Sequence, residues 1–324
     1  MRRCKRALLA LALVAGWAVA YLFAWSPGPR THDPSTIIKC KDEYWFFTTG
    51  AGLPSWHSRN LITWKPGPRV FSTFPRWITQ VAPGQRGYFW APDVTFTNGQ
   101  YYLYYAVSRF GARTSAIGLA TNRTLDPSDP EYHWSDHGIV VQTTMRNNYN
   151  AIDPSVMIDT DQRMWMSFGS FWSGIKLVEL DPATGLRKAG APLHALAAAK
   201  QIEASYLYRH GGSYFLFVNW GLCCRGVKST YEIRVGRSAR ITGPYLDRTG
   251  KNLLAGGGTL FLGREGRFIG PGQTGILRDG GNEWLSYHYY DGKDFGQATL
   301  GLRKLEWDKD GWPVAGENAA EVLK

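Results

Sequence analysis

The sequence predicts an all-β protein, more narrowly a five-bladed β-propeller, and three observations predict it. Aromatic residues make up 14% of the 324 residues and glycine occurs 37 times, whereas charged residues make up only 19%. This composition favours short strands and tight turns, because aromatic side chains fit a pleated surface and glycine adopts turn conformations easily. The third observation is a sequence phrase that recurs five times at intervals suited to propeller blades.

Each copy of the phrase has an acidic or small residue, then proline or another small residue, a short strand, a polar turn and an aromatic strand. The copies span residues 33–47, 91–105, 153–166, 203–217 and 272–287. Turn signals such as Asn98-Gly99 and Gly211-Gly212 separate the two strands, so each copy predicts a β-hairpin. A sandwich would not repeat one phrase so regularly. Residues 27–324 are therefore predicted to form one domain of five blades, with a short helix in the alanine-rich stretch 193–203.

Residues 1–26 predict an export signal or a membrane anchor. Residues 1–6 are basic and residues 7–25 carry no charge, which is the pattern of a secretory leader. Ala18-Val19-Ala20 offers a cleavage site between small residues, whereas the apolar run beyond it, up to Trp25, favours an uncleaved anchor. The globular domain is thus expected to be secreted or periplasmic, or else attached to the membrane through this segment alone.

The formal net charge of +11 does not indicate nucleic acid as a partner. Four of the positive charges lie within residues 1–6, and the others are scattered without a run of like sign. A nucleic-acid site would be expected to gather them into a stripe or patch. The sequence therefore predicts no nucleic-acid binding.

Three cysteines lie beyond the leader: Cys40, Cys223 and Cys224. They do not make a disulfide scaffold, and no pair has the C-x-x-C spacing of a zinc site. The adjacent Cys223 and Cys224 can form a disulfide with each other, one of them can pair with Cys40, or they can stay reduced. The sequence leaves these alternatives open.

Three copies of the repeated sequence begin with an acid, at the start of the predicted innermost strand of a blade: Asp33, Asp153 and Glu203. A propeller brings such positions together at one end of its central axis. Carboxylates crowded into an aromatic pocket cannot all ionise equally, because repulsion and desolvation drive their pKa values apart. Glycoside hydrolysis needs one protonated and one ionised carboxyl group. Metal binding by the three acids is the less favoured interpretation, because no histidines accompany them at ligand spacing and HExxH is absent.

Four motifs together resemble glycoside hydrolase family 43: Thr-His-Asp-Pro-Ser at 31–35, Phe-Trp-Ala-Pro-Asp-Val at 89–94, Asn-Ala-Ile-Asp-Pro-Ser at 150–155 and Glu-Ala-Ser at 203–205. The stretch Cys-Cys-Arg-Gly-Val-Lys-Ser-Thr-Tyr at 223–231 is similar to the endo-1,5-α-L-arabinanase branch of that family. The resemblance covers roughly residues 30–312. It implies the same five-bladed fold that the repeats predict.

The resemblance implies an inverting hydrolase that cleaves internal α-1,5-L-arabinofuranosidic linkages of arabinan or arabino-oligosaccharides. Asp33 would be the general base, Glu203 the general acid, and Asp153 the residue that raises the pKa of Glu203 and orients it. An exo-acting α-L-arabinofuranosidase or β-xylosidase of the same fold is the alternative. A non-catalytic carbohydrate-binding propeller is a third hypothesis, which the three acids disfavour.

By the same resemblance, His288 would bind one metal ion in the central channel, with calcium as the expected ion, although a single imidazole is an unusual ligand for calcium. No organic cofactor is expected, and the protein is expected to be a monomer. Aromatic and short polar residues near the acids are expected to contact the sugar: Trp90, Phe110, Gly111, Asn150, Ser170, Phe171 and Trp172.

Overall fold

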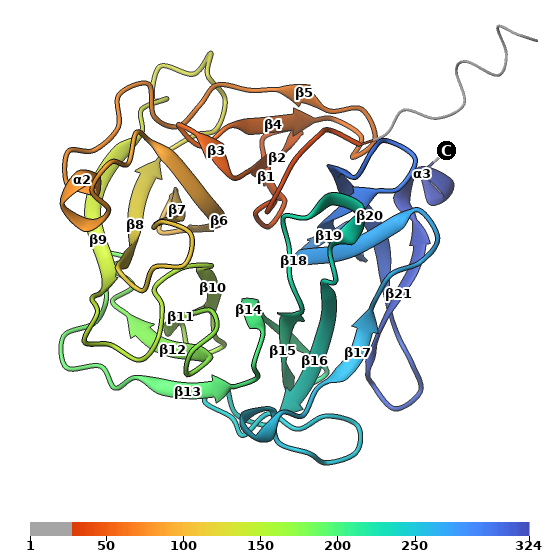
Figure 1. Ribbon diagram of the computed structural model, residues 1–324. Helices are drawn as coiled ribbons and strands as arrows, with labels where there is room; N and C mark the ends of the chain where they lie inside the picture. Colours follow the sequence, from red (N-terminus) through yellow and green to blue (C-terminus); the bar gives the residue numbers. More distant parts are fainter. Residues whose placement is uncertain (1–27, 324) are drawn as a thin grey trace, which may run out of the picture.

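Five antiparallel sheets surround a central axis in the computed structural model, which describes residues 28–323 (Figure 1). The prediction of an all-β, five-bladed propeller is confirmed. The predicted leader, residues 1–26, lies outside the described residues. Within residues 28–323, no helix is both long enough and apolar enough to cross a membrane.

Each blade takes its strands in chain order, apart from one short strand that joins the neighbouring blade. The first blade contains β1 (Ile38–Cys40), β2 (Glu43–Phe47), β4 (Ser55–Ser58) and β5 (Lys65–Pro66). The second contains β3 (Gly50–Ala51), β6 (Tyr88–Thr97), β7 (Gln100–Val107), β8 (Ser115–Asn122) and β9 (Ser135–Thr143). The third contains β10 (Ser155–Ile158), β11 (Met164–Phe168), β12 (Ile175–Leu180) and β13 (His194–Ala197).

The last two blades each have four strands. The fourth contains β14 (Ile202–His210), β15 (Ser213–Trp220), β16 (Glu232–Ser238) and β17 (Thr259–Leu262). The fifth contains β18 (Phe268–Asp279), β19 (Asn282–Asp291), β20 (Gln297–Trp307) and β21 (Pro313–Asn318). Helical turns are short: α2 (Ile78–Val81), α3 (Ala319–Val322), η1 (Gly226–Lys228) and η2 (Leu253–Ala255).

Tight turns set the register of the hairpins, as the turn residues predict. Asn98 and Gly99, between β6 and β7, both have positive φ angles, 50° and 73°. Two-residue hairpin turns of this kind match the twist of antiparallel strands. Because strands alternate in direction, the first turn of every blade lies at the end of the propeller opposite to the start of its innermost strand. The second connection of each blade then returns to the starting end.

Aromatic side chains fill the space between neighbouring blades. Phe71, Phe89 and Tyr105 pack together between the first two blades, with ring centroids 5.0 to 5.2 Å apart. Tyr206 and Tyr287 belong to the corresponding cluster between the fourth and fifth blades. Large rings suit these wedge-shaped interfaces because each buries a large apolar area. Most of the aromatic excess in the composition is therefore accounted for by packing between blades.

The ring closes where the N-terminal segment meets the last blade. The backbone of Arg30 bridges Thr299 of β20, and the Leu300 N–H donates to the Pro29 carbonyl at 3.0 Å. The two ends of the described chain are thereby brought to the same blade.

The predicted helix at 193–203 is wrong. His194–Ala197 is β13, and it pairs with β12 at the outer edge of the third blade. Alanine favours helix only weakly, and hydrogen bonding to an open strand edge outweighs that preference here. The rest of the stretch leads directly into β14.

Candidate active site

One unusual backbone conformation marks the same position in all five blades. Asp33, Ala91, Asp153, Ala204 and Gln273 all have φ between 37° and 58°. This left-handed conformation costs an L-residue roughly 1 kcal/mol or more. At each of these residues the chain bends sharply. Regular pairing of the innermost strand with the second strand of the blade begins after this bend. The repeats can therefore be aligned by this conformation rather than by residue type.

This alignment corrects one expectation from the sequence. Asp33 and Asp153 occupy equivalent positions, but Ala204, not Glu203, is their equivalent in the fourth blade. The pairing of β14 with β15 is irregular between Glu203 and Tyr206, as expected for a bulge. A bulge re-aims the neighbouring side chains. Glu203 reaches the site from one residue earlier in the repeat.

The three acids line one pocket with a volume of about 950 Å³. We call Asp33, Asp153 and Glu203 the floor acids. All seven residues predicted to contact sugar also line this pocket: Trp90, Phe110, Gly111, Asn150, Ser170, Phe171 and Trp172. The predicted ion ligand, His288, is fully buried and contacts Asp33 instead of lining the pocket.

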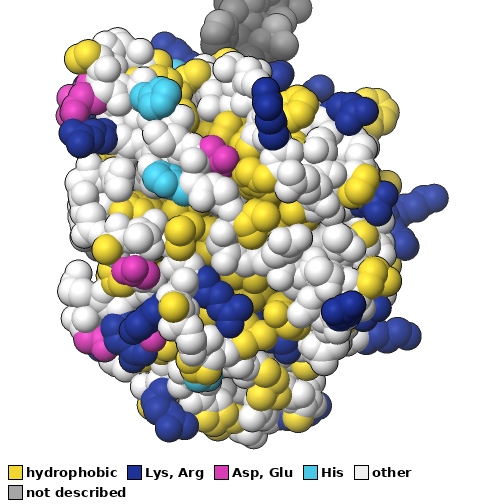
Figure 2. Space-filling model, turned by 90° about the vertical axis from the view of Figure 1, so that its left-hand side faces the viewer, with side chains coloured by type: hydrophobic (Ala, Val, Ile, Leu, Met, Phe, Trp, Pro, Cys, Tyr) yellow, Lys and Arg dark blue, Asp and Glu magenta, His cyan; other side chains and the backbone are white. Residues whose placement is uncertain are grey.

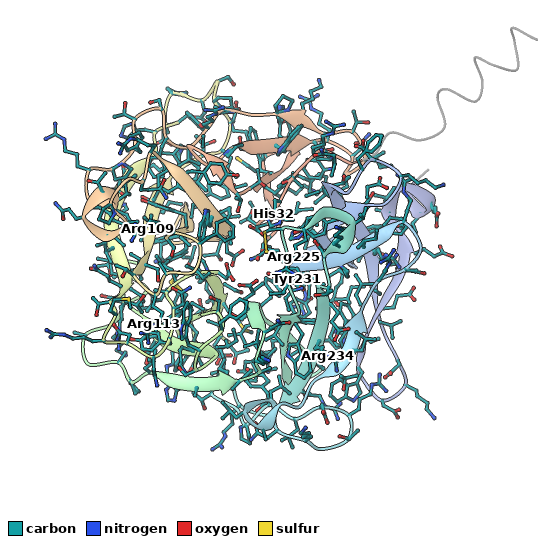
Figure 3. The ribbon with its side chains drawn as sticks, in the orientation of Figure 1. His32, Arg109, Arg113, Arg225, Tyr231 and Arg234 are labelled. Carbon is teal, nitrogen blue, oxygen red and sulfur yellow. A yellow bond between two sulfur atoms is a disulfide. The ribbon has the colours of Figure 1, made fainter. Side chains whose placement is uncertain are left out.

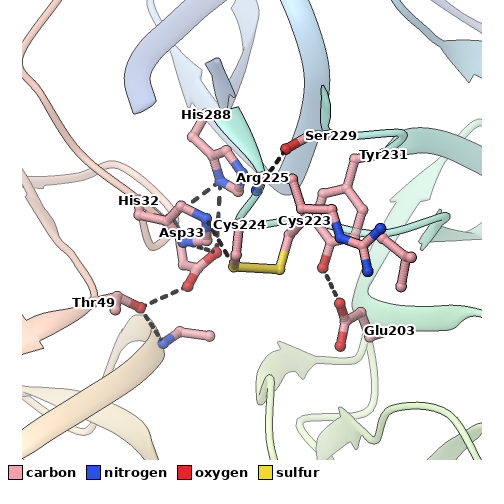
Figure 4. Close-up of a disulfide and its surroundings, with 12 residues drawn as sticks. His32, Asp33, Thr49, Glu203, Cys223, Cys224, Arg225, Ser229, Tyr231 and His288 are labelled. Carbon is pink, nitrogen blue, oxygen red and sulfur yellow. Dashed lines mark hydrogen bonds and ion pairs between the residues drawn. A yellow bond between two sulfur atoms is a disulfide. The ribbon is translucent and has the colours of Figure 1, made fainter. Parts of the chain in front are cut away.

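Asp33 is held as a carboxylate by three neighbours. Its Oδ1 lies 2.8 Å from Nδ1 of His32, and its Oδ2 accepts a hydrogen bond from Thr49 Oγ1 at 2.6 Å (Figure 4). Burial alone would raise the pKa of Asp33, but His32, His288 and Thr49 together lower it to about 2. Thr49 Oγ1 in turn accepts from the Ala91 N–H at 2.8 Å, so the orientation of the hydroxyl is determined by the backbone of the second blade.

Glu203 has the opposite electrostatic environment. Burial raises its pKa to about 7, a hydrogen bond from Tyr231 to Oε1 lowers it, and the charge of Asp33 raises it. Burial and repulsion by Glu203 and Asp33 also raise the pKa of Asp153. Asp153 and Glu203 are coupled, and the charge of Glu203 keeps Asp153 protonated, so the two titrate as a pair. Asp153 Oδ2 also accepts from the Ala204 N–H at 3.0 Å, which anchors the peptide that follows Glu203.

The pocket therefore holds one ionised carboxyl group, Asp33, and two carboxyl groups with raised pKa values, Asp153 and Glu203. An ionised carboxylate can take a proton from water, and a carboxyl group with a pKa near 7 can give a proton to a leaving oxygen. Because Glu203 Oε1 accepts from Tyr231, its acidic proton is left to Oε2. The arrangement is suited to acid–base hydrolysis.

A disulfide between Cys223 and Cys224 lies at the wall of the pocket. Cys40 is free and buried, so of the three alternatives left open by the sequence, the structure has the adjacent pair. The Cys224 N–H donates to Tyr290 Oη at 2.6 Å, and Tyr290 Oη lies 2.7 Å from His32 Nε2. This chain of contacts connects the wall to the histidine beside Asp33.

The other walls combine aromatic rings with oriented polar groups. The Trp90 and Phe110 rings lie 5.0 Å apart. Phe171 and Trp172 are consecutive residues with φ of 46° and 37°, a strained conformation typical of functional sites. Asn150 is only 3% exposed and donates to Ser170 Oγ at 2.9 Å. Asn150 therefore supports the neighbouring wall more than it faces the open pocket.

His288 could hold a metal ion. Its Nδ1 accepts from the Asp33 N–H at 3.2 Å, and its ring stacks on His32 with centroids 4.1 Å apart. Within residues 28–323, its buried Nε2 has no hydrogen-bond partner, and neither do the hydroxyls of Thr274 and Ser286. Burial lowers the pKa of His288 to about 3, so the imidazole is neutral, as a metal ligand must be. The sulfurs near His32 offer no thiolate, because they form the disulfide.

Several residues at this site were missed by the sequence reasoning. His32 lies in the motif 31–35 directly before Asp33, and Tyr231 ends the motif 223–231. Both residues could therefore have been identified from their positions in these motifs. Thr49 had no such local signal, because it reaches Asp33 only when the chain after β2 folds back on the segment before β1. The cations Arg109, Lys200 and Arg225 also line the pocket, although the sequence analysis treated the basic residues as scattered.

Comparison with known proteins gives consistent matches. Residues 28–313 match the family model described as glycosyl hydrolases family 43. The chain is 39% identical over 300 residues to an extracellular exo-α-(1→5)-L-arabinofuranosidase of Cellvibrio japonicus, covering 88% of this chain and 86% of that protein. It is 41% identical over 290 residues to an extracellular endo-α-(1→5)-L-arabinanase of Bacillus subtilis, covering 87% and 86%.

Solved structures agree with these matches. The Cellvibrio cellulosa α-L-arabinanase in complex with arabinohexaose has a TM-score of 0.86 and 38% identity, covering 89% of this chain and 96% of that one. The endo-arabinanase of Bacillus licheniformis has a TM-score of 0.83 and 41% identity, covering 90% and 100%.

Proposed function

The chain belongs to glycosyl hydrolase family 43, and from this premise we propose that it hydrolyses internal α-1,5-L-arabinofuranosidic linkages of arabinan with inversion at the anomeric carbon. The observation that carries the proposal is the pair of opposite pKa shifts in one pocket, about 2 for Asp33 and about 7 for Glu203. Relatives named as arabinanases support arabinan as the substrate.

In the proposed reaction, Asp33 is the general base and Glu203 is the general acid. Water attacks the anomeric carbon while Asp33 takes one of its protons. The bond from that carbon to the glycosidic oxygen breaks, and Glu203 gives its proton to the departing oxygen. An inverting enzyme keeps its two carboxyl groups roughly 6.5 to 9.5 Å apart, so that the water fits between them. Asp153 supports Glu203 by raising its pKa and by holding the Ala204 peptide.

The pocket walls are proposed to bind the sugar chain. Arabinofuranose rings have apolar faces that pack on aromatic side chains, so Trp90, Phe110, Phe171 and Trp172 are the expected platforms. Ser170 and the Gly111 backbone lie beside them, and Asn150 supports this wall through its bond to Ser170.

An exo-acting enzyme is the second candidate, because the Cellvibrio japonicus relative is named as an exo-arabinofuranosidase. Time-resolved product analysis on linear arabinan separates the candidates. We expect a series of oligosaccharides at the earliest times. A single short product from the first time point would support exo cleavage. Action on xylosides but not on arabinan would favour a β-xylosidase, and binding without any turnover would favour a non-catalytic propeller.

We further propose that His288 holds one calcium ion through Nε2, with oxygen ligands from water. A cation there would add positive charge beside Asp33 and so favour its ionised form. Thermal unfolding with and without chelator tests this site without relying on activity. We expect chelation to lower the melting temperature and calcium to restore it, and we expect His288→Ala to abolish that response. A melting temperature unaffected by chelator and calcium would rule out the site.

Export is proposed from the extracellular names of both relatives together with the leader at 1–26. Mass spectrometry of the mature protein would distinguish cleavage near Ala20 from retention of the segment as an anchor. The protein is proposed to act as a monomer, which sedimentation velocity would test.

A further inference from the structure

Five loops that line the pocket contain basic residues but no acidic ones. At the end of the propeller where the floor acids lie, the fifth-blade connections 263–267 and 292–296 carry Glu265 and Asp294, which pair with Arg303 and Arg30. Five other connections at this end line the pocket: residues 108–114, 144–152, 169–174, 198–202 and 221–230. We call these the rim loops. They contain no Asp or Glu, and they contain six cationic residues: Arg109, Arg113, Arg146, Lys200, Arg225 and Lys228. The rim is therefore cationic above a floor of carboxyl groups.

The rim cations have no acidic partners. None of the six forms an ion pair with any residue of 28–323. Arg113 donates to the Asn147 carbonyl at 3.1 Å and lies over the Trp172 ring, which holds its charge at the pocket without neutralising it. In Figure 3, Arg109 and Arg113 lie across the central opening from Arg225.

The opposite end of the propeller contrasts with the rim. There Lys41 is 2.7 Å from Asp126 and 2.8 Å from Asp129, and Arg248 pairs with Asp308. In Figure 2, which views the flank of the second and third blades, most Asp and Glu side chains lie in the left half, together with some Lys and Arg side chains. Lys and Arg side chains protrude along the right-hand edge, the end that faces the viewer in Figure 1. Ion pairs thus neutralise several basic residues at the opposite end, whereas the six rim cations have no such partners among residues 28–323.

We propose that the rim loops bind a carboxylate-bearing polysaccharide, and that the neutral chain to be cleaved enters the pocket from it. Six like charges around one opening repel one another, and a polyanion lying across them would relieve that repulsion. The floor acids, with Asp33 ionised, would repel a carboxylate at the point of cleavage. The positive rim would attract an acidic polymer, and the negative floor would admit only a neutral side chain of that polymer to the point of cleavage.

The geometry favours a glycan over an anionic membrane. The most exposed aromatic residue of the rim loops, Phe110, packs at a tilt against Trp90 of the pocket wall, and Trp172 lies under Arg113. Both rings thus contact residues of the pocket wall, where they can pack against sugar. The inference rests on the proposed glycan-cleaving function and adds the class of polymer that carries the cleaved chain.

The test is binding of the purified protein to polygalacturonate, measured by calorimetry at low salt and again at physiological salt. This polymer contains no arabinofuranose, so the result does not depend on arabinan being the substrate. The double variant Arg146→Glu/Lys228→Glu changes two rim cations that do not line the pocket. Lys251→Glu/Lys309→Glu makes the same change in charge at the opposite end, where neither lysine has an ion-pair partner among the described residues, and serves as the matched control.

We expect the rim variant to bind polygalacturonate roughly tenfold more weakly or worse, the control to bind like the unmodified protein, and added salt to weaken all binding. Equal losses in the two variants would overturn the proposal, because net charge alone would then explain binding. Absence of binding at low salt would also overturn it, as would binding to phosphatidylglycerol vesicles without binding to polygalacturonate.

Discussion

Asp33 and Glu203 stand at the openings of the first and fourth blades, and their carboxyl groups have pKa values shifted in opposite directions. Both side chains line the same pocket, and burial raises the pKa of both. Asp33 is surrounded by His32, His288 and a threonine hydroxyl, which more than offset its burial. The Tyr231 hydroxyl and the more distant charge of His32 stabilise the Glu203 carboxylate, but they do not offset its burial and the repulsion by Asp33.

The comparison teaches that burial by itself does not assign acid and base. Two buried carboxyl groups in one pocket acquire opposite pKa shifts because different partners surround them. The partners of Asp33 come from its own segment, from the end of β2 and from β19, whereas Tyr231 comes from the segment before β16. The blade interfaces therefore determine which carboxyl group is ionised.

The largest expected effect comes from removing either carboxyl group. Asp33→Ala should lower kcat/KM by on the order of 10³-fold on every substrate, because no group remains to activate water. Glu203→Ala should lose a similar factor on arabinan but far less on an aryl arabinofuranoside with an acidic phenol, because that leaving group needs no proton. Steady-state rates on both substrates check the difference. Equal losses on the two substrates in Glu203→Ala would break the assignment.

A smaller effect is expected at Thr49, which supports only the base. Thr49→Val removes the hydroxyl that bonds Asp33 and keeps the shape of the side chain. We expect kcat to fall roughly tenfold to a hundredfold, since hydrogen bonds to charged groups are among the stronger ones. Thr49→Ser keeps the hydroxyl and should retain most activity. If serine and valine were equally impaired, the methyl group and not the hydroxyl would be what matters.

The smallest effects should appear in the pH profile, and they should have opposite signs. Activity needs protonated Glu203, so the alkaline limb of kcat/KM follows its pKa. Asp153→Asn removes the carboxyl group that titrates together with Glu203 and should move that limb down. Tyr231→Phe removes a hydrogen bond that favours the carboxylate and should move it up.

The profiles of the two variants should be measured on the same arabino-oligosaccharide, with circular dichroism to verify folding. Shifts in the same direction, or a limb that stays in place in Asp153→Asn, would contradict the modulating role of Asp153. An unmoved limb in Tyr231→Phe would remove Tyr231 from the control of Glu203.

Much of the site was predictable from the sequence because it lies in the repeated phrase. Asp33 and Asp153 share one repeat position, and hairpin signals such as Asn98-Gly99 define the blades around them. Glu203 lines the predicted pocket but lies one residue before the shared repeat position, because a bulge cannot be seen in residue type. The 193–203 stretch was misassigned because alanine content is a local signal, whereas β13 exists only through pairing with β12.

The sequence by itself determined the number of blades, the acids that open them and the aromatic residues of the pocket, because these follow from local patterns repeated along the chain. Only the tertiary structure decided which carboxyl group is ionised, which cysteines pair and where the unpaired cations gather. Those properties depend on groups far apart in sequence, such as His288 beside Asp33 or Arg109 opposite Arg225. Electrostatic environment and burial act through space, so they exist only once the blades have closed around their axis.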